Sequence, residues 1–150
     1  MKNLVTLFTL SLSLVLASCS GDEEGSELTA ENLEGKWKIT AFEAEEGNDR
    51  VEFQECEKTL VYEFTTKEAE KLSDGTETME LIVTNPEQCE VFFARGEGWE
   101  TVYGMAGSRL YIKNLYMAGT SFSGGFKVKE FDGKKLVLQL FKHTVTFEKV

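Results

Sequence analysis

From Lys36 to the C-terminus, apolar and polar residues alternate along much of the chain with a period of two. The first such run places Trp37, Ile39 and Ala41 between polar neighbours. A period of two sends successive side chains to opposite faces, so one face is buried and the other is solvated. The pattern therefore predicts β-strands and no long helix. Later runs of the same kind contain Leu60, Tyr62 and Phe64; Met79, Leu81 and Val83; Leu110 and Ile112; Phe126 and Val128; and Leu136, Leu138 and Leu140.

Short segments rich in Gly, Asn, Asp, Ser and Pro separate these runs. Such residues favour turns because they tolerate unusual backbone angles or bond to their own backbone. The Asp132-Gly133 pair is the strongest hairpin signal in the chain. We expect eight to ten short strands in an all-β antiparallel meander, which hides its edges most simply by closing into a small barrel. The other turn segments are residues 47–49, 73–75, 85–86, 96–98, 106–108 and 118–120.

Two segments depart from simple alternation. Residues 66–72 are mostly charged and lack an apolar stripe, so we interpret them as a charged loop or a strand extension. Near the C-terminus the apolar positions change phase between Leu140 and Val145. This change predicts a bulge or a tight turn near Lys142 and His143.

The N-terminus has the three parts of a secretory signal. Lys2 supplies a positive charge, residues 4–16 form an apolar run, and Ala17-Ser18 are small residues suited to cleavage. The apolar run is shorter than the roughly 20 residues that a transmembrane helix needs. We therefore expect a signal peptide over residues 1–18 and no transmembrane helix.

Residues 16–19 read Leu-Ala-Ser-Cys and resemble the lipobox of bacterial lipoproteins. The resemblance implies that Cys19 becomes the first mature residue and carries a diacylglycerol and a further acyl chain such as palmitate. Three acyl chains make a durable membrane anchor. Ordinary secretion with a free Cys19 thiol is the alternative.

The acidic residues 20–26 have nothing to bury and are expected to remain flexible. They resemble the surface-export signal of Bacteroidetes lipoproteins, and a plain spacer is the alternative. Residues 19–32 are thus predicted to be a lipidated cysteine and an acidic tether, and residues 33–150 a single barrel domain. The expected location is the outer membrane, with the domain on the cell surface or, alternatively, facing the periplasm.

A short helical turn with Thr29 as its N-cap is predicted before Gly35. The following Gly35-x-Trp37 motif resembles the start of lipocalins and of the lipocalin-like lipoproteins of Bacteroidetes. The resemblance implies a small barrel with an interior, whose base Trp37 closes. The chain departs from that family in two respects. It has no Thr-Asp-x-Tyr-like turn, and Lys142 or Lys149 stands where lipocalins place an arginine on the tryptophan.

The charge of the chain excludes some partners. Loss of Lys2 with the signal peptide changes the net charge from −10 to −11, which argues against nucleic acid or an anionic membrane surface. Residues 20–100 carry a net charge of −16, and residues 101–150 carry +5. This division either serves solubility or orients the domain on a partner.

Cys56 and Cys89 follow a signal peptide, and in an oxidising compartment a disulfide is expected. The bond would close a loop of about 34 residues and contribute about 3–4 kcal/mol. Two buried thiols or a reactive cysteine are the alternatives. His143 is the only histidine, which disfavours a catalytic triad or a histidine zinc site, and we expect it at the surface. We predict no metal and no cofactor.

The sequence predicts a binding module for a small apolar or amphipathic ligand held in the barrel. A filled barrel, acting as a structural or interaction subunit of an envelope complex, is the alternative. A carboxylate-based hydrolase has the least support, because the many glutamates form no recognisable pair. The side chains expected to line the interior are Ile39, Tyr62, Phe64, Leu81, Phe93, Tyr103, Ile112, Phe126, Val128, Leu138 and Phe147.

Overall fold

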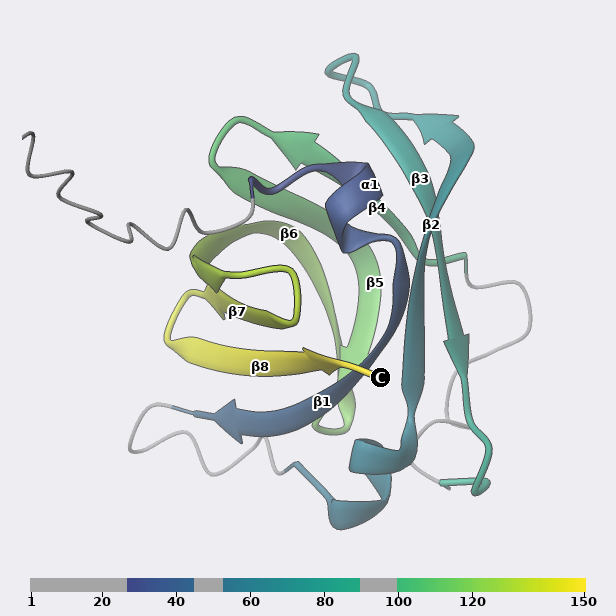
Figure 1. Cartoon of the computed structure of the whole chain (residues 1–150), viewed down its shortest axis with the longest axis vertical. Coiled ribbons are helices and arrows are strands. Elements are labelled where there is room, and N and C mark those ends of the chain that lie inside the picture. Colours follow the sequence, from purple (N-terminus) through teal and green to yellow (C-terminus); the bar gives the residue numbers. More distant parts are fainter. Residues whose placement is uncertain (1–26, 45–52, 90–99) are drawn as a thin grey trace, which may run out of the picture.

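The computed structural model describes residues 27–44, 53–89 and 100–150. In these residues each of eight antiparallel strands pairs with its neighbours in sequence, and β1 also pairs with β8, so the sheet closes into a barrel (Figure 1). The predicted all-β barrel and the helical turn before its first strand are confirmed. The elements are α1 (Ala30–Leu33), β1 (Gly35–Glu43), η1 (Glu55–Thr59), β2 (Val61–Lys71), β3 (Glu77–Thr84), β4 (Val102–Ala106), β5 (Arg109–Met117), β6 (Thr120–Phe131), β7 (Lys135–Leu140) and β8 (His143–Lys149).

Strand β1 closes the barrel because each of its edges meets a partner. Trp37 lies opposite Tyr62 of β2 on one side and opposite Lys149 of β8 on the other. The alternation of the sequence turns Trp37 and Ile39 inward, where both are fully buried. Closure gives both terminal strands of the meander a neighbour, which is how a sheet of this kind removes its outer edges.

Strand β2 is bent by irregularities in its pairing with β3. The register shifts between Phe64 and Glu68, and again between Glu68 and Lys71. Extra residues in one strand of an antiparallel pair bend that strand and increase its twist. The charged residues 66–72 are therefore mainly a strand extension, since β2 continues to Lys71.

The turn between β7 and β8 explains the change of phase near the C-terminus. Leu140 lies opposite His143, so the turn consists of Phe141 and Lys142, with Phe141 at a φ of 53°. The predicted tight turn is confirmed, but the expected surface position of His143 is wrong. A two-residue turn places His143 opposite the inward-facing Leu140, and the histidine is only 9% exposed. Phe141 is instead the exposed residue of the turn, at 83%.

The end of the barrel that carries α1, at the top of Figure 1, is called the upper end. The side chain of Thr29 caps α1 by accepting a 3.2 Å hydrogen bond from the backbone N–H three residues further on. Trp37 Nε1 donates a 2.8 Å hydrogen bond to the carbonyl of Leu33, which fixes α1 over the barrel. Lys149 Nζ lies 5.3 Å from the centre of the Trp37 ring, so Lys149 rather than Lys142 covers the tryptophan.

Gly35 is required where the chain passes from α1 into β1. Its φ is +129°, a conformation that residues with a side chain rarely adopt. A Cβ atom at this position would also lie 2.8 Å from Cε of Lys149. The glycine of the Gly35-x-Trp37 motif therefore permits both the backbone turn and the close approach of the lysine that covers Trp37.

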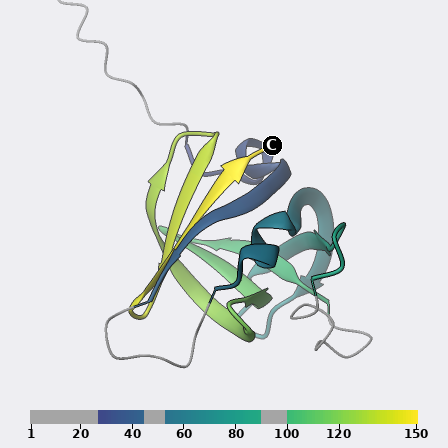
Figure 2. The same cartoon turned by 90° about the horizontal axis from the view of Figure 1, so that it is seen from below.

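The opposite, lower end of the barrel carries η1, seen from below in Figure 2. A disulfide joins Cys56 of η1 to Cys89, which follows β3, and the two Cα atoms are 5.4 Å apart. The predicted disulfide is confirmed. It ties the connection between β1 and β2 to the segment that leaves β3.

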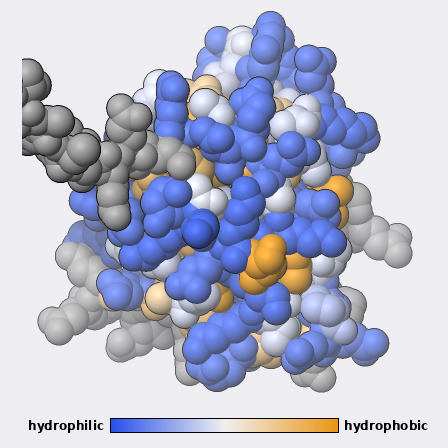
Figure 3. Space-filling model, in the orientation of Figure 1, coloured by the Kyte–Doolittle hydropathy of each residue, from blue (hydrophilic) through white to orange (hydrophobic). Residues whose placement is uncertain are grey.

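The face seen in Figure 3 is mainly hydrophilic, and its most prominent hydrophobic cluster lies where Figure 1 marks the C-terminus. Val150 at that terminus is exposed. No helix among the described residues is long and apolar enough to cross a membrane. The predicted signal peptide, Cys19 and most of the acidic tether lie outside the described residues, as does Phe93.

Candidate binding sites inside and outside the barrel

The side chains predicted to line a ligand cavity fill the barrel instead. Nine of them have between 0 and 3% of their surface exposed, and Val128 is half-buried against them. A side chain that borders a water-sized void keeps accessible surface, so the near-zero values mean that these residues contact one another. The nine are Ile39, Tyr62, Phe64, Leu81, Tyr103, Ile112, Phe126, Leu138 and Phe147.

Aromatic rings form the centre of this packing. The ring of Phe64 is 4.9 Å from that of Tyr103 and 6.5 Å from that of Phe147, both in edge-to-face geometry. Tyr62 meets Phe147 at 5.4 Å, and Trp37 meets Phe64 at 6.3 Å. Edge-to-face pairs at these distances are favourable because the positive edge of one ring meets the negative face of the next. The upper half of the interior is therefore a continuous aromatic cluster.

The two tyrosine hydroxyls in this cluster bond to the barrel itself. Tyr62 Oη donates to the carbonyl of Tyr116 at 3.0 Å, and Tyr103 Oη donates to the carbonyl of Thr65 at 2.6 Å. Burial strongly raises the pKa of Tyr103, and the charges of two nearby glutamates raise it further. Both hydroxyls thus serve the fold as neutral donors and are not directed at an interior ligand.

A second aromatic cluster lies at the lower end. Phe42 stacks on Phe53 at 5.9 Å and on His143 at 5.7 Å, and Phe122 meets His143 edge-on at 5.7 Å. The imidazole is thus held among rings, and its buried Nδ1 has no hydrogen-bond partner. A hollow of about 430 Å³ on the side of this cluster is bordered by Phe42 and Phe53 and by the Glu55–Lys58 ion pair.

Glu57 of η1 is a fully buried carboxylate that we did not predict. Its Oε2 accepts a 2.8 Å hydrogen bond from the backbone N–H of Gln54, and its Oε1 has no hydrogen-bond partner. Burial raises the pKa of Glu57, and the backbone N–H groups of Gln54, Ala118 and Gly119 oppose this by smaller amounts. The Gln54–Glu57 spacing is that of a capping box, the sequence signal that could have revealed this residue.

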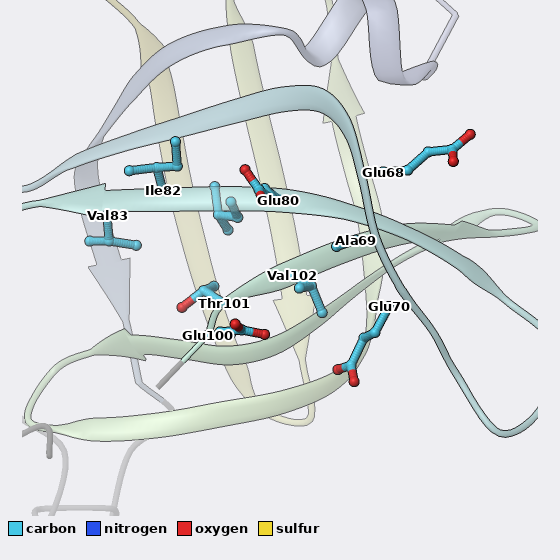
Figure 4. A pocket seen from close by; sticks show the side chains of 10 residues that line it. Glu68, Ala69, Glu70, Glu80, Ile82, Val83, Glu100, Thr101 and Val102 are labelled. Atoms are coloured by element: carbon cyan, nitrogen blue, oxygen red, sulfur yellow. The ribbon is translucent and has the colours of Figure 1, made fainter. Parts of the chain in front are cut away.

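A groove lies on the outside of the barrel where β3 and β4 part. Their last register pair is Glu80 with Val102, after which the N–H of Leu81 donates a 3.0 Å hydrogen bond to the carbonyl of Thr101. β3 continues to Thr84, paired with β2. The groove has a volume of about 500 Å³ (Figure 4). It arises because the two strands separate while β2 bends over them.

The groove combines an apolar floor with an acidic border. Ile82, the outward residue of β3 at this point, is 43% exposed, and Val83 and Val102 also line the groove (Figure 4). We call the four glutamates that border the groove the rim glutamates. Sequence analysis did not identify this site, since it depends on how three strands diverge. The rim glutamates are Glu68, Glu70, Glu80 and Glu100.

Two of the rim glutamates are already neutralised. Glu80 forms a 2.7 Å ion pair with Lys67, and Glu70 pairs with Lys113, whose pKa is raised by that hydrogen bond. Among the described residues, no group of three or more histidine, cysteine or carboxylate side chains could hold a metal ion.

The fold and the sites define a small closed antiparallel barrel of the binding-domain type. The family model for the lipocalin-like domain matches residues 33–138, more than half of the chain. The chain therefore belongs to the lipocalin-like domain family. Comparison with curated proteins and with solved structures gave no significant match.

Proposed function

We propose that this protein is a lipid-anchored binding module of the bacterial envelope, with a filled barrel that meets its partner through the outer surface. The observation that carries the proposal is the packing of the interior, where the residues first expected to hold a ligand bury one another. The filled-barrel alternative from the sequence is thus favoured over a ligand in the barrel. The lipocalin-like family supports a binding role, because its fold typically binds rather than catalyses.

Opening the interior to a ligand would require the aromatic cluster to separate. Each aromatic pair contributes about 0.5–1.5 kcal/mol beyond burial, and exposing one large apolar side chain costs about 1.5–3 kcal/mol. A ligand would have to offset several such terms at once. The outer groove needs no comparable rearrangement, because its floor is already accessible at Ile82.

A hydrolase would need two carboxylates facing a common cleft. Glu57 is the one buried carboxylate in the part of the chain that the structure describes, and it belongs to η1. The rim glutamates border a groove, but two of the four are engaged with lysines. These positions favour binding over catalysis.

The proposed location rests on the sequence of the N-terminal segment and on the disulfide. The lipobox at residues 16–19 supports lipidation of Cys19, and the acidic tether supports display of the domain away from the membrane. The Cys56–Cys89 bond supports export, because disulfides persist in oxidising compartments. The outer membrane, with the barrel at the cell surface, is the location we propose; a periplasm-facing barrel is the alternative.

Native mass spectrometry of protein purified from its own source tests the filled barrel. We expect the mass of the lipidated polypeptide alone. The Phe126→Ala variant supplies a matched control, because removing a fully buried ring leaves an apolar cavity that can accept a probe such as benzene. A stoichiometric small molecule that leaves the wild-type protein only on denaturation would contradict the proposal and restore the ligand-carrying function.

Membrane fractionation tests the anchor. Cys19→Ala should move the protein from the membrane fraction to the soluble fraction and abolish incorporation of labelled palmitate, whereas Ser20→Ala should change neither. If the Cys19→Ala protein stays with the membrane, the lipobox interpretation is wrong.

A further inference from the structure

We propose that a patch on the outer face of β5 and β6 binds an acidic saccharide, a sugar chain whose rings carry carboxylate groups. The patch consists of Arg109 and Tyr111 on β5 and of Gly125 and Lys127 on β6. This inference rests on the proposed function, because it assigns a partner to the outer surface of a filled barrel. Three features support it: two cations without a counter-charge, an arginine held in one orientation, and an aromatic ring beside a glycine.

Alternation along the two strands places the patch on the outside of the barrel. Leu110 and Phe126 are fully buried, so their neighbours Arg109 and Lys127 face outward, and both are exposed. Strand β5 is paired with β4 on one side and with β6 on the other (Figure 1). The patch therefore needs no free strand edge, and the strands on both sides of β5 are described.

The two cations of the patch stand directly opposite each other. Arg109 is the register partner of Lys127, and neither forms an ion pair with a carboxylate among the described residues. Like charges at opposite positions of two strands repel, and an anion bound between them would remove this repulsion. The neighbouring Lys113 and Lys135, in contrast, are paired with glutamates. The patch also lies in residues 101–150, the part of the chain with a net charge of +5.

The side chain of Arg109 is held in one orientation on the sheet. Its Nη1 donates a 2.9 Å hydrogen bond to the carbonyl of Gly125, and its stem lies against that glycine. A Cβ atom at Gly125 would be 3.3 Å from Cδ of Arg109, so a larger residue would force the arginine to shift. A guanidinium has five N–H groups in a planar fork, and this bond uses one of them. The others are available to a planar anion such as a carboxylate.

Tyr111 supplies a contact for the sugar ring. It lies opposite Gly104 on β4 and opposite Gly125 on β6, so neither neighbouring strand places a side chain directly beside it. The start of β3 covers the Gly104 side, because a Cβ atom there would lie 2.6 Å from the carbonyl oxygen of Glu77. On the Gly125 side, among the described residues not adjacent in the chain, Arg109 alone would come within 4 Å of a Cβ atom. The apolar face of a sugar ring can pack on the half-buried tyrosine from this side.

An acidic saccharide fits the patch better than a small inorganic anion or a neutral sugar. Inorganic phosphate would meet Arg109 and Lys127 but would leave the ring of Tyr111 uncovered. A neutral sugar would cover the tyrosine but would leave the two cations without a counter-charge. A uronic acid presents a planar carboxylate and an apolar ring face on one unit, which matches both parts of the patch.

Isothermal titration calorimetry of the full lipidated protein in non-ionic detergent, with a galacturonic acid trimer, tests the patch. We expect the trimer to bind at least about tenfold more tightly than maltotriose or inorganic phosphate, since each of these supplies only one kind of contact. Lys127→Gln should weaken binding of the trimer by about two- to fivefold, the effect of one exposed charge pair. Lys36→Gln removes an exposed cation from β1, outside the patch, and binding should be nearly unchanged.

Gly125→Ala tests the position of the arginine without changing any charge. The added Cβ would force Arg109 to shift, so binding of the trimer should weaken by about two- to fivefold although both cations remain. Ser121→Ala makes a small change on the same strand outside the patch and should leave binding unchanged. Circular dichroism of each variant checks that the fold is retained.

Each contrary outcome overturns the inference. Absence of trimer binding, or equal binding of phosphate and the trimer, would exclude a saccharide site. Equal weakening by Lys127→Gln and Lys36→Gln would show attraction by net charge alone, and full binding by Gly125→Ala would show that the position of Arg109 does not matter. Tightening of about tenfold when the acidic residues 22–24 are replaced by their amides would make that segment the occupant. A ligand found in the barrel by native mass spectrometry would instead overturn the proposed function, independently of these results.

Discussion

The two ends of the barrel are closed by different kinds of contact. At the upper end, the Trp37 N–H bonds to the Leu33 carbonyl and Lys149 lies over the tryptophan ring. At the lower end, the closure consists of η1 and a disulfide, and two buried polar atoms, Oε1 of Glu57 and Nδ1 of His143, have no hydrogen-bond partner. Since an unpaired buried polar atom costs free energy, the lower end is less well satisfied than the upper end.

This difference indicates which end can respond to conditions. The upper end is closed by the apolar ring of Trp37, whose one hydrogen-bond donor is paired. The stability of this end should therefore depend little on pH or on reducing agents. The lower end depends on a covalent bond that reduction breaks and on a buried carboxylate whose charge depends on pH.

Trp37→Ala should lower the free energy of unfolding by about 3–5 kcal/mol, because it leaves a large cavity in the fully buried upper cluster. Phe53→Ala in the half-buried lower cluster should cost less, about 1–2 kcal/mol, since a half-buried ring loses less burial. Urea unfolding followed by circular dichroism measures both. Equal losses for the two variants would show that the better-satisfied upper end contributes no more to stability than the lower end.

Replacing both Cys56 and Cys89 with serine should lower the free energy of unfolding by about 3–4 kcal/mol, on the model in which the bond restricts the unfolded chain. Dithiothreitol should destabilise the wild-type protein by a similar amount and leave the double variant unchanged. Urea unfolding with and without the reductant makes this comparison. If the reductant has no effect on the wild-type protein, the lower end is not held by the disulfide.

Features that depend on local sequence could be predicted, whereas features that depend on contacts between distant segments could not. The barrel and its inward residues were predictable because a period of two determines which face of a strand is buried, as at Tyr62 and Ile112. The buried position of Trp37 was predictable because the residue belongs to the Gly35-x-Trp37 motif and falls on the inward-facing positions of the first strand.

The errors arise where neighbouring segments decide the outcome. His143 is buried because the two-residue turn places it opposite Leu140, and a lone histidine carries no pattern that shows this. Glu57 is one glutamate among many, and its burial depends on contact of η1 with the turn at Ala118 and Gly119. The rim glutamates are brought together by strands whose separation no local pattern encodes.

His143→Phe should raise the free energy of unfolding by about 1–2 kcal/mol, because it removes a buried Nδ1 without a partner and keeps a ring among the phenylalanines. Urea unfolding at neutral pH measures the change. At the upper end the corresponding removal of a polar group, Trp37→Phe, should be destabilising, since its N–H is paired with Leu33. The opposite signs would establish the contrast between the two ends, and a loss of stability in His143→Phe would remove it.

The smallest expected effect is the pH dependence from Glu57. Burial raises its folded-state pKa above the ordinary value of 4.5, so between these two pKa values the folded state holds a proton that the unfolded state releases. The stabilisation from protonated Glu57 is complete below pH 4.5 and is lost as pH rises through the folded-state pKa. Glu57→Gln removes this titration and should make the difference in stability between the two proteins depend on pH.

The comparison requires unfolding measurements on both proteins between pH 4.5 and 7.5. Relative to Glu57→Gln, the wild-type protein should lose stability as pH rises across this range. Glu55→Gln is the matched control, because Glu55 lies on the same η1 but is exposed and paired with Lys58. A pH-dependent difference of the same size for Glu55→Gln would trace the effect to surface charge and not to the buried carboxylate at the lower end.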